Sequence, residues 1–520
     1  MKRNSRFLLF FLAAFLVGAS VLTADLNQNS LAAQSPVALS QGPKAYAQDI
    51  AKLLKRHDKL ELDPAAVAEQ VRQTGRVFLP TSEGGFEISL APRELRSQRY
   101  RSQETGEHGV RDLERGPVRT YKGTVAGQPG AQARFTIDKN TFEGLVITPD
   151  QLYFIEPASR YSAAAATRDF IVYKQADLLQ TSFGECGLTM AEKVNSEAQR
   201  LQGQTGVSFE NAKVDEFFSP PRIVDLATEA DFEYFTFFGS STAANNEIIS
   251  IMNLVEGIYD TQFGLQFSLV FQNVWSTAGD PYTATAASAA LDEFTGYWNA
   301  NHGSLNRDLA HMWTGKSFDG STIGIAWRPG LNCPLGQLGY GMSERLTGSP
   351  AKIILSAHEI GHNFNATHVD AAQNCTNTIM GTTLGPNTAQ TFCAFSVTEI
   401  ETHANAKVAC LAQALTPGCT YSLSGSGQSF GATGGSGSVN VNTVGTNCAW
   451  SANSAVTWIS ITSGNSGTNS GTVNFTVAPN VAGFARSGLI RIAEQNFIVT
   501  QAGGPGCKIV PIFLGQEVIN

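Results

Sequence analysis

The stretch HEIGHNFNATH, residues 358–368, contains three of the chain's eight histidines. His358 and His362 are four residues apart, so on a helix their imidazoles project from one face and can bind a single Zn²⁺ ion. Glu359 lies beside the first ligand, where it can act as general base and acid. With His368 as third ligand, one zinc position stays open for water, an arrangement that hydrolyses peptide bonds.

A helix followed by a sharp turn must position these side chains. Ser349 as N-cap and Pro350 as first residue mark the helix start, and apolar residues follow at helical spacing: Ile353, Ile354, Ala357, Ile360, Gly361 and Phe364. In a continued helix His368 would lie about 9 Å beyond His362 along the axis, so the chain must turn back. Asn365 tolerates the left-handed conformation that such a turn needs.

Two alternatives to a catalytic centre are open. The histidines could match the pattern by chance on a surface helix, or the site could bind zinc without catalysing a reaction. The remaining histidines have no spacing that suggests a ligand set, and we expect them on the surface or in the core: His57, His108, His302, His311 and His403.

The N-terminus has the pattern of a secretory signal peptide. Lys2, Arg3 and Arg6 precede an apolar run from residue 7 to about 21, and cleavage is expected after Ala24. The alternative is a membrane anchor, but the run is shorter than the roughly 20 residues that span a bilayer. We therefore expect an exported, soluble, extracellular protein, most simply a monomer.

Length and composition indicate several units. A chain of 520 residues with 42% hydrophobic residues suggests about three or four domains. The net charge of −8 is spread without long runs, which argues against nucleic acid and anionic lipid as partners. After the expected signal peptide, residues 1–24, strand-like pieces fill 25–215, strands and helices alternate over 216–415, short alternating strands over 419–503 predict a β-sandwich, and 504–520 remain unassigned.

The central unit resembles the metzincin zinc metalloproteases, whose pattern is HExxHxxGxxH followed by a methionine turn. The three histidines and Glu359 match it, Asn365 replaces the glycine, and NTIMG supplies Met380. The resemblance implies an α/β catalytic domain with a mixed, twisted sheet, an active-site helix and Met380 as an apolar floor under the zinc. Val369 separates Asp370 from the third histidine, so whether Asp370 braces the methionine turn stays open. Whether the domain binds structural calcium also stays open.

Among metzincins, the chain is most similar to the adamalysin or reprolysin group. NCPLGQLGYGMSE resembles the edge strand on which substrate adds as an antiparallel strand. The order of the cysteines implies disulfides Cys333–Cys410 and Cys375–Cys393. The segment from TYKGTV to LYFIEP is similar to the group's propeptide.

Cys186 stands about 150 residues from any other cysteine. GECGLTM resembles the cysteine switch of adamalysin propeptides, in which a thiolate occupies the open zinc position. The alternative is a buried or disulfide-bonded cysteine. Activation would then require a cut after Cys186 and before the strand near Arg222.

Residues 419–503 resemble a BACON-type β-sandwich, in which Cys419 and Cys448 could form a bridge. Trp450 or Trp458 could attach to a glycan or host surface, or both could be core residues of a spacer domain. Cys507 has no assigned partner. The sequence thus predicts a secreted zinc endopeptidase made as a latent precursor; the alternative is a secreted adhesin or glycan-binding protein with an inactive metalloprotease-like domain.

Overall fold

The computed structural model describes residues 35–149, 151–179, 182–187, 221–331, 338–407, 411–413, 419–454, 456, 458–481, 485–493 and 495–504. The expected signal peptide, most of the unassigned tail, and Cys333, Cys410 and Cys507 lie outside these residues. Among the described residues, none of the helices combines the length and apolar character needed to span a bilayer.

The N-terminal unit is mostly β, as predicted. Its antiparallel sheet has the strand order β1-β2-β11-β10-β9-β8-β7-β4-β3. The strands are β1 (Val37–Leu39), β2 (Asp58–Leu62), β3 (Arg76–Thr81), β4 (Gly84–Pro92), β7 (Thr120–Val125), β8 (Gln132–Ile137), β9 (Phe142–Ile147), β10 (Leu152–Pro157) and β11 (Asp169–Lys174). Two helices, α2 (Ala47–Ile50) and α3 (Pro64–Thr74), accompany the sheet, and Asp63 caps α3 by accepting from the Ala65 N–H at 3.0 Å.

The central unit is built on a second, mixed sheet in the order β18-β12-β16-β17-β15-β13-β14-β5-β6, with β19 paired to β13. Its strands are β5 (Arg96–Gly106), β6 (Gly109–Leu113), β12 (Gly184–Cys186), β13 (Arg222–Ala230), β14 (Leu265–Trp275), β15 (Leu309–Thr314), β16 (Thr322–Ala326), β17 (Tyr340–Glu344), β18 (Thr383–Leu384) and β19 (Ala412–Gln413). Three of them, β5, β6 and β12, come from the segment 25–215 that the sequence places in a separate propeptide. An unpaired strand edge favours the pairing of a further strand, and β5 and β12 pair with strands of the central sheet in this way. The expected boundary at residue 215 is therefore not a boundary between the two sheets.

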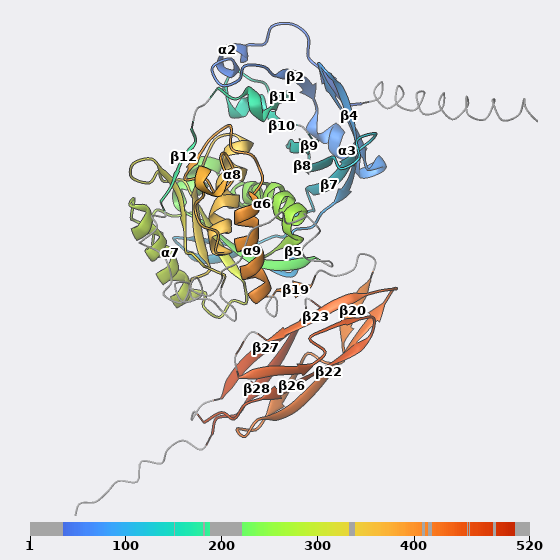
Figure 1. Ribbon diagram of the computed structural model, residues 1–520, viewed down its shortest axis with the longest axis vertical. Coiled ribbons are helices and arrows are strands. Elements are labelled where there is room, and N and C mark those ends of the chain that lie inside the picture. Colours follow the sequence, from blue (N-terminus) through green and yellow to red (C-terminus); the bar gives the residue numbers. More distant parts are fainter. Residues whose placement is uncertain are drawn as a thin grey trace, which may run out of the picture.

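Helices cover both faces of this sheet (Figure 1). They are α5 (Phe232–Phe238), α6 (Ser241–Phe263), α7 (Ala287–Asn301), α8 (Ser349–Asn363) and α9 (Ala394–Ala406). Helices α6, α8 and α9 share one apolar core, and α7 contributes to another with the opposite side chains of the sheet. Strand β13 ends at Ala230, because Asp231 caps α5 by accepting from the Tyr234 N–H at 2.8 Å.

The edge strand lies elsewhere than the sequence suggested. Within NCPLGQLGYGMSE, the residues of β17 pair on both sides, parallel to β15 and antiparallel to β16. The outer strand of the segment 221–413 is therefore β16, and its free side pairs with β12. The prediction fails because the position of a strand just before α8 in the sequence does not show whether another strand pairs with its outer side in the sheet.

The C-terminal unit is a β-sandwich, drawn in orange to red in Figure 1. One sheet has the order β20-β22-β26-β24 and the other β21-β28-β27-β23-β25. The strands are β20 (Thr420–Leu423), β21 (Gly427–Phe430), β22 (Gly435–Val444), β23 (Ala449–Ser454), β24 (Ile459–Ser463), β25 (Ser466–Thr468), β26 (Gly471–Val477), β27 (Arg486–Ile492) and β28 (Gln495–Gln501).

The two tryptophans of the sandwich differ in burial. Trp450 is a core residue whose Nε1–H donates to the Asn469 carbonyl at 2.6 Å. Trp458 is half-buried, and the Arg486 guanidinium lies 4.2 Å from its ring centroid. Attachment to a surface through Trp450 is therefore wrong, because its ring packs between the sheets.

Candidate metal centre

Helix α8 carries the first two histidines, and its start differs from the prediction. Gly348, with φ of 89°, is the N-cap, and Ser349 is the first helical residue. The Ser349 N–H and hydroxyl both donate to Glu156 Oε1, at 2.9 and 2.8 Å. The expected Ser349 cap is therefore wrong, because this hydroxyl serves as a donor to a carboxylate of the N-terminal unit, whose charge suits a helix N-terminus.

The turn after α8 is the one that the sequence predicts. Asn365 has φ of 74°, and its N–H donates to the His362 carbonyl at 2.8 Å. The Ala366 N–H donates back to the Gly361 carbonyl at 3.0 Å. These bonds end the helix and return the chain, so that His368 reaches the two histidines of α8.

The three imidazoles converge through their Nε2 atoms. The Nε2 of His362 lies 3.0 Å from that of His358, and the Nε2 of His368 lies 3.2 Å from both. Their spacing is close to the roughly 3.3 Å separating nitrogens that share a tetrahedral zinc ion at 2.0 to 2.1 Å.

The hydrogen bonds of the Nδ1 atoms explain why the Nε2 atoms of His358 and His362 do not form a hydrogen bond with each other. His358 Nδ1 lies 2.6 Å from the Ile379 carbonyl, and His362 Nδ1 lies 2.8 Å from the Ala366 carbonyl. A carbonyl only accepts, so each Nδ1 carries the proton and each Nε2 presents a lone pair. Two lone pairs 3.0 Å apart repel unless a cation lies between them, so the residues fit a metal ion.

Burial keeps the imidazoles neutral, which is the state that binds metal. Desolvation lowers the pKa of His358 to about 3, helped by the charge of His368. Desolvation also lowers the pKa of His368 to about 4 and that of His362 well below its usual value. The donor set of three neutral imidazoles suits zinc.

Met380 packs against Gly361 of α8, and the turn that contains it is held by Val369. Met380 is fully buried, and a Cβ on Gly361 would lie only 2.7 Å from its sulfur. The Val369 N–H donates to the Met380 carbonyl at 3.0 Å. Asp370 instead caps a short turn, accepting from the Ala372 N–H at 2.6 Å. The backbone of Val369 therefore makes the contact that Asp370 was considered for.

Glu359 points toward β16. It is fully buried, and its Oε1 has no hydrogen-bond partner within the part of the chain that the structure describes. Desolvation raises the pKa of Glu359 well above its usual value, partly opposed by the Cys186 thiol. A Cβ on Gly324 of β16 would lie 2.5 Å from Glu359 Oε1, so only glycine leaves room for this carboxyl group.

Cys186 reaches the centre from β12. Its sulfur lies 3.5 Å from His362 Nε2 and 3.6 Å from Glu359 Oε2. With the three histidines it forms a group whose ligand atoms lie within 4.8 Å of one another. Strand β12 runs parallel to β16 and antiparallel to β18, so it lies between the two strands that border the centre.

Two of the expected cysteine pairs form disulfides. Cys375 and Cys393 are joined with an S–S distance of 1.98 Å, next to the turn that carries Met380. Cys419 and Cys448 are joined at 2.01 Å in the sandwich. The expected pair Cys333–Cys410 lies outside the described residues.

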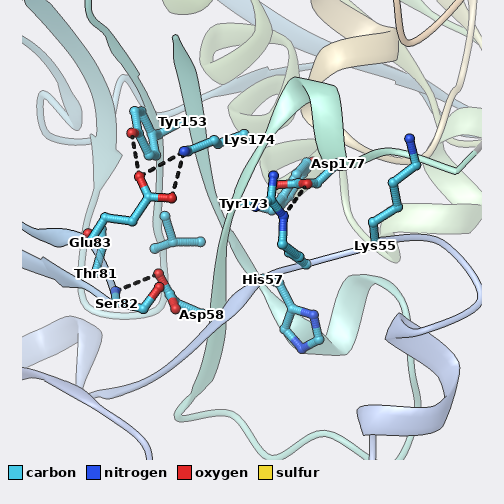
Figure 2. A pocket seen from close by; sticks show the side chains of 12 residues that line it. Lys55, His57, Asp58, Thr81, Ser82, Glu83, Tyr153, Tyr173, Lys174 and Asp177 are labelled. Carbon is cyan, nitrogen blue, oxygen red and sulfur yellow. Dashed lines mark hydrogen bonds and ion pairs between the residues drawn. The ribbon is translucent and has the colours of Figure 1, made fainter.

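The other histidines lie away from the centre. His311 and His403 are buried, His302 and His57 are half-buried, and His108 is exposed. His57 borders a hollow of about 370 Å³ in the N-terminal unit, shown in Figure 2. Charged side chains around this hollow form ion pairs with each other, Lys174 with Glu83 at 2.7 Å and Arg56 with Asp177 at 3.0 Å. These ion pairs indicate a structural role for the residues of the hollow.

Sequence reasoning missed the groups that support the ligands. The carbonyls of Ile379 and Ala366 leave no trace in residue types. Gly324 does leave a signal, since a glycine inside a strand pattern often marks a close approach. Glu156, some 200 residues from α8 in the chain, carries none.

Comparison with known families agrees with this geometry. Residues 220–417 match the reprolysin-type model of metallopeptidase family M12, and residues 449–502 match the BACON family of binding domains. The metallopeptidase match and the converging imidazoles do not favour the alternative of an inactive domain in an adhesin. The three imidazoles and Glu359 thus lie in the segment that is similar to metallopeptidase family M12, and the β-sandwich contains the segment that is similar to the BACON family.

Proposed function

We propose that the protein is a secreted zinc-dependent endopeptidase that is made as a latent precursor. The observation that carries the proposal is the convergence of three Nε2 atoms beside a buried glutamate. The M12 match supports the zinc peptidase class. The N-terminal pattern of basic residues before an apolar run supports secretion.

His358, His362 and His368 would hold the zinc ion. Bound there, zinc supplies polarisation of the scissile carbonyl and a lower pKa for water. Glu359 accepts the proton of the attacking water on a carboxylate oxygen and donates it to the nitrogen of the leaving amine. The Ile379 and Ala366 carbonyls fix the tautomers of the two helical ligands.

Cys186 maintains latency in this proposal. Its sulfur occupies the space between His362 and Glu359 where water and proton acceptor must meet. Strand β12 at the same time covers the edge of β16. A peptide substrate would take its place as an added strand, and so activation requires that β12 leave.

Casein digestion tests the proposal. The chain cut between residues 187 and 221 should digest casein, and 1,10-phenanthroline should abolish the digestion. Glu359→Ala should keep the fold while activity falls by about 10² to 10⁴ fold, the usual contribution of general acid and base catalysis. Exposed Glu107→Ala serves as control. Undiminished digestion by Glu359→Ala would refute the mechanism.

A further inference from the structure

The described residues 35–187, which form the N-terminal unit and strands β5, β6 and β12, contact the metallopeptidase domain in two places of unequal extent. One is the strand β12 beside the metal centre, where three residues pair with β16 and β18. The other is a broad contact with β14, α6 and the start of α8. The two contacts differ in what their loss would expose.

At β14, the N-terminal unit completes the catalytic sheet. Strand β5 runs parallel to β14 with pairs from Leu269↔Arg96 to Trp275↔Thr105. The Leu269 N–H donates to the Leu95 carbonyl at 2.7 Å. Nearly all residues of β14 are buried, so removal of β5 would turn a buried strand into an open edge.

At α6, the contact contains buried charges. Glu256 is fully buried and takes two bonds from Arg93, at 2.8 and 2.7 Å, and one from Arg134 at 3.0 Å. The Arg134 side chain is itself fully buried. Burial alone would raise the pKa of Glu256, but Arg93 and Arg134 outweigh it and the pKa is lowered. Without the two arginines, Glu256 would be an unpaired buried charge.

The apolar core is also shared. Leu145, Phe154 and Ile171 of the N-terminal sheet belong to the same buried cluster as Ile251 and Ile258 of α6. A segment that leaves on activation would expose this cluster to water, which is unfavourable for a soluble enzyme.

We propose that residues 35–179 remain bound as a permanent subunit of the mature peptidase, and that only the strand carrying Cys186 leaves the metal centre. The first part is independent of the proposed activity, and the second part rests on it. The mature enzyme is then a two-chain complex, and the N-terminal sheet is part of its structure.

The test uses the full chain carrying Glu359→Ala, so its outcome does not depend on activity. Recognition sites of a sequence-specific protease are inserted between residues 180 and 181 and between residues 200 and 201, both outside the described residues. After both cuts, the fragment ending at 180 should co-elute with the fragment beginning at 201 in gel filtration. The peptide 181–200, which contains Cys186, should be lost.

Separate elution of the fragment ending at 180 without denaturant would overturn the permanent subunit. Retention of the peptide 181–200 would overturn the selective departure of β12. Separate elution would not bear on casein digestion by the active chain. Retention of the peptide would also contradict the proposed activation but not the peptidase activity itself, which casein digestion by the doubly cut parent chain measures, so the two proposals fail separately.

A matched pair of variants locates the contact. Arg93→Ala with Arg134→Ala should weaken the association of the cut fragments by at least about 100-fold, because Glu256 stays buried without a positively charged partner, with only the Phe267 N–H donating to it. Arg72→Ala with Arg111→Ala removes two exposed arginines of the same segment and should leave the association unchanged. Equal effects of both pairs would overturn the assignment of the contact to Glu256.

Discussion

A fully buried glutamate lies at each end of helix α8, Glu156 of β10 at its start and Glu359 of α8 itself near its end, and their surroundings differ. Near the start, Glu156 accepts from Ser349, Arg160, Tyr161 and Tyr173. Near the end, Glu359 Oε1 has no partner among the described residues. Burial would raise both pKa values, yet Arg160 and other donors lower that of Glu156 while that of Glu359 stays raised.

The difference separates structure from chemistry. A buried polar group whose bonds are all made stabilises one arrangement, and a buried group left without a partner indicates a missing ligand or reactant. At the histidine end, two Nε2 lone pairs also face each other. The cluster at Glu156 therefore has the features of a structural site, and the cluster at Glu359 those expected of the proposed catalytic site.

The largest structural effect is expected from Glu156→Ala. It leaves the Ser349 N–H without its buried acceptor and removes one of the two buried carboxylates that accept from Arg160, the other being Glu143, so the free energy of unfolding should fall by about 3 to 5 kcal/mol. Urea unfolding measures the loss, and Glu156→Gln, which keeps the shape, should lose less. A loss under about 1 kcal/mol would contradict the assigned structural role.

A smaller effect is expected from acid. Burial raises and Arg160 lowers the pKa of Glu143, with a net value of about 2 against the ordinary 4.5. A lowered pKa in the folded state contributes stability above pH 4.5 that is lost as the pH falls toward 2. The contribution is on the order of 3 kcal/mol.

Thermal unfolding between pH 4.5 and 2 tests this prediction. Glu143→Gln should be less stable at pH 7, and its stability should depend less on pH in that window. If the variant and the parent chain lose stability in parallel as the pH falls, the charge of Glu143 has no such role.

The smallest effect is expected at the turn between the second and third histidine ligands, His362 and His368. Asn365→Ala places an alanine at φ of 74°, which should cost about 1 kcal/mol of unfolding free energy. Asn365→Gly removes the strain and should be close to neutral. Melting curves of the two variants measure the difference, and a less stable glycine variant would show that the Asn365 side chain matters more than its backbone.

How far the sequence predicts the structure depends on the range of the interaction. The HExxH spacing, the left-handed turn at Asn365 and the β-sandwich over 419–503 follow from local periodicity and turn chemistry. The pairing of β5 with β14 joins residues about 170 apart, and the capping of α8 by Glu156 joins residues about 190 apart. No local pattern encodes such contacts, so the sequence did not predict the pairing of β5 with β14, and the predicted Ser349 cap was wrong.

The central claim is that three imidazoles bind one metal ion, and metal analysis of the purified chain tests it most directly. Elemental analysis after dialysis should find about one zinc ion per chain in the parent and in Glu359→Ala, and almost none in His368→Ala. His368 is half-buried in a loop, so this variant is expected to keep its fold. Zinc absent from the parent, or equally abundant in His368→Ala, would contradict the account.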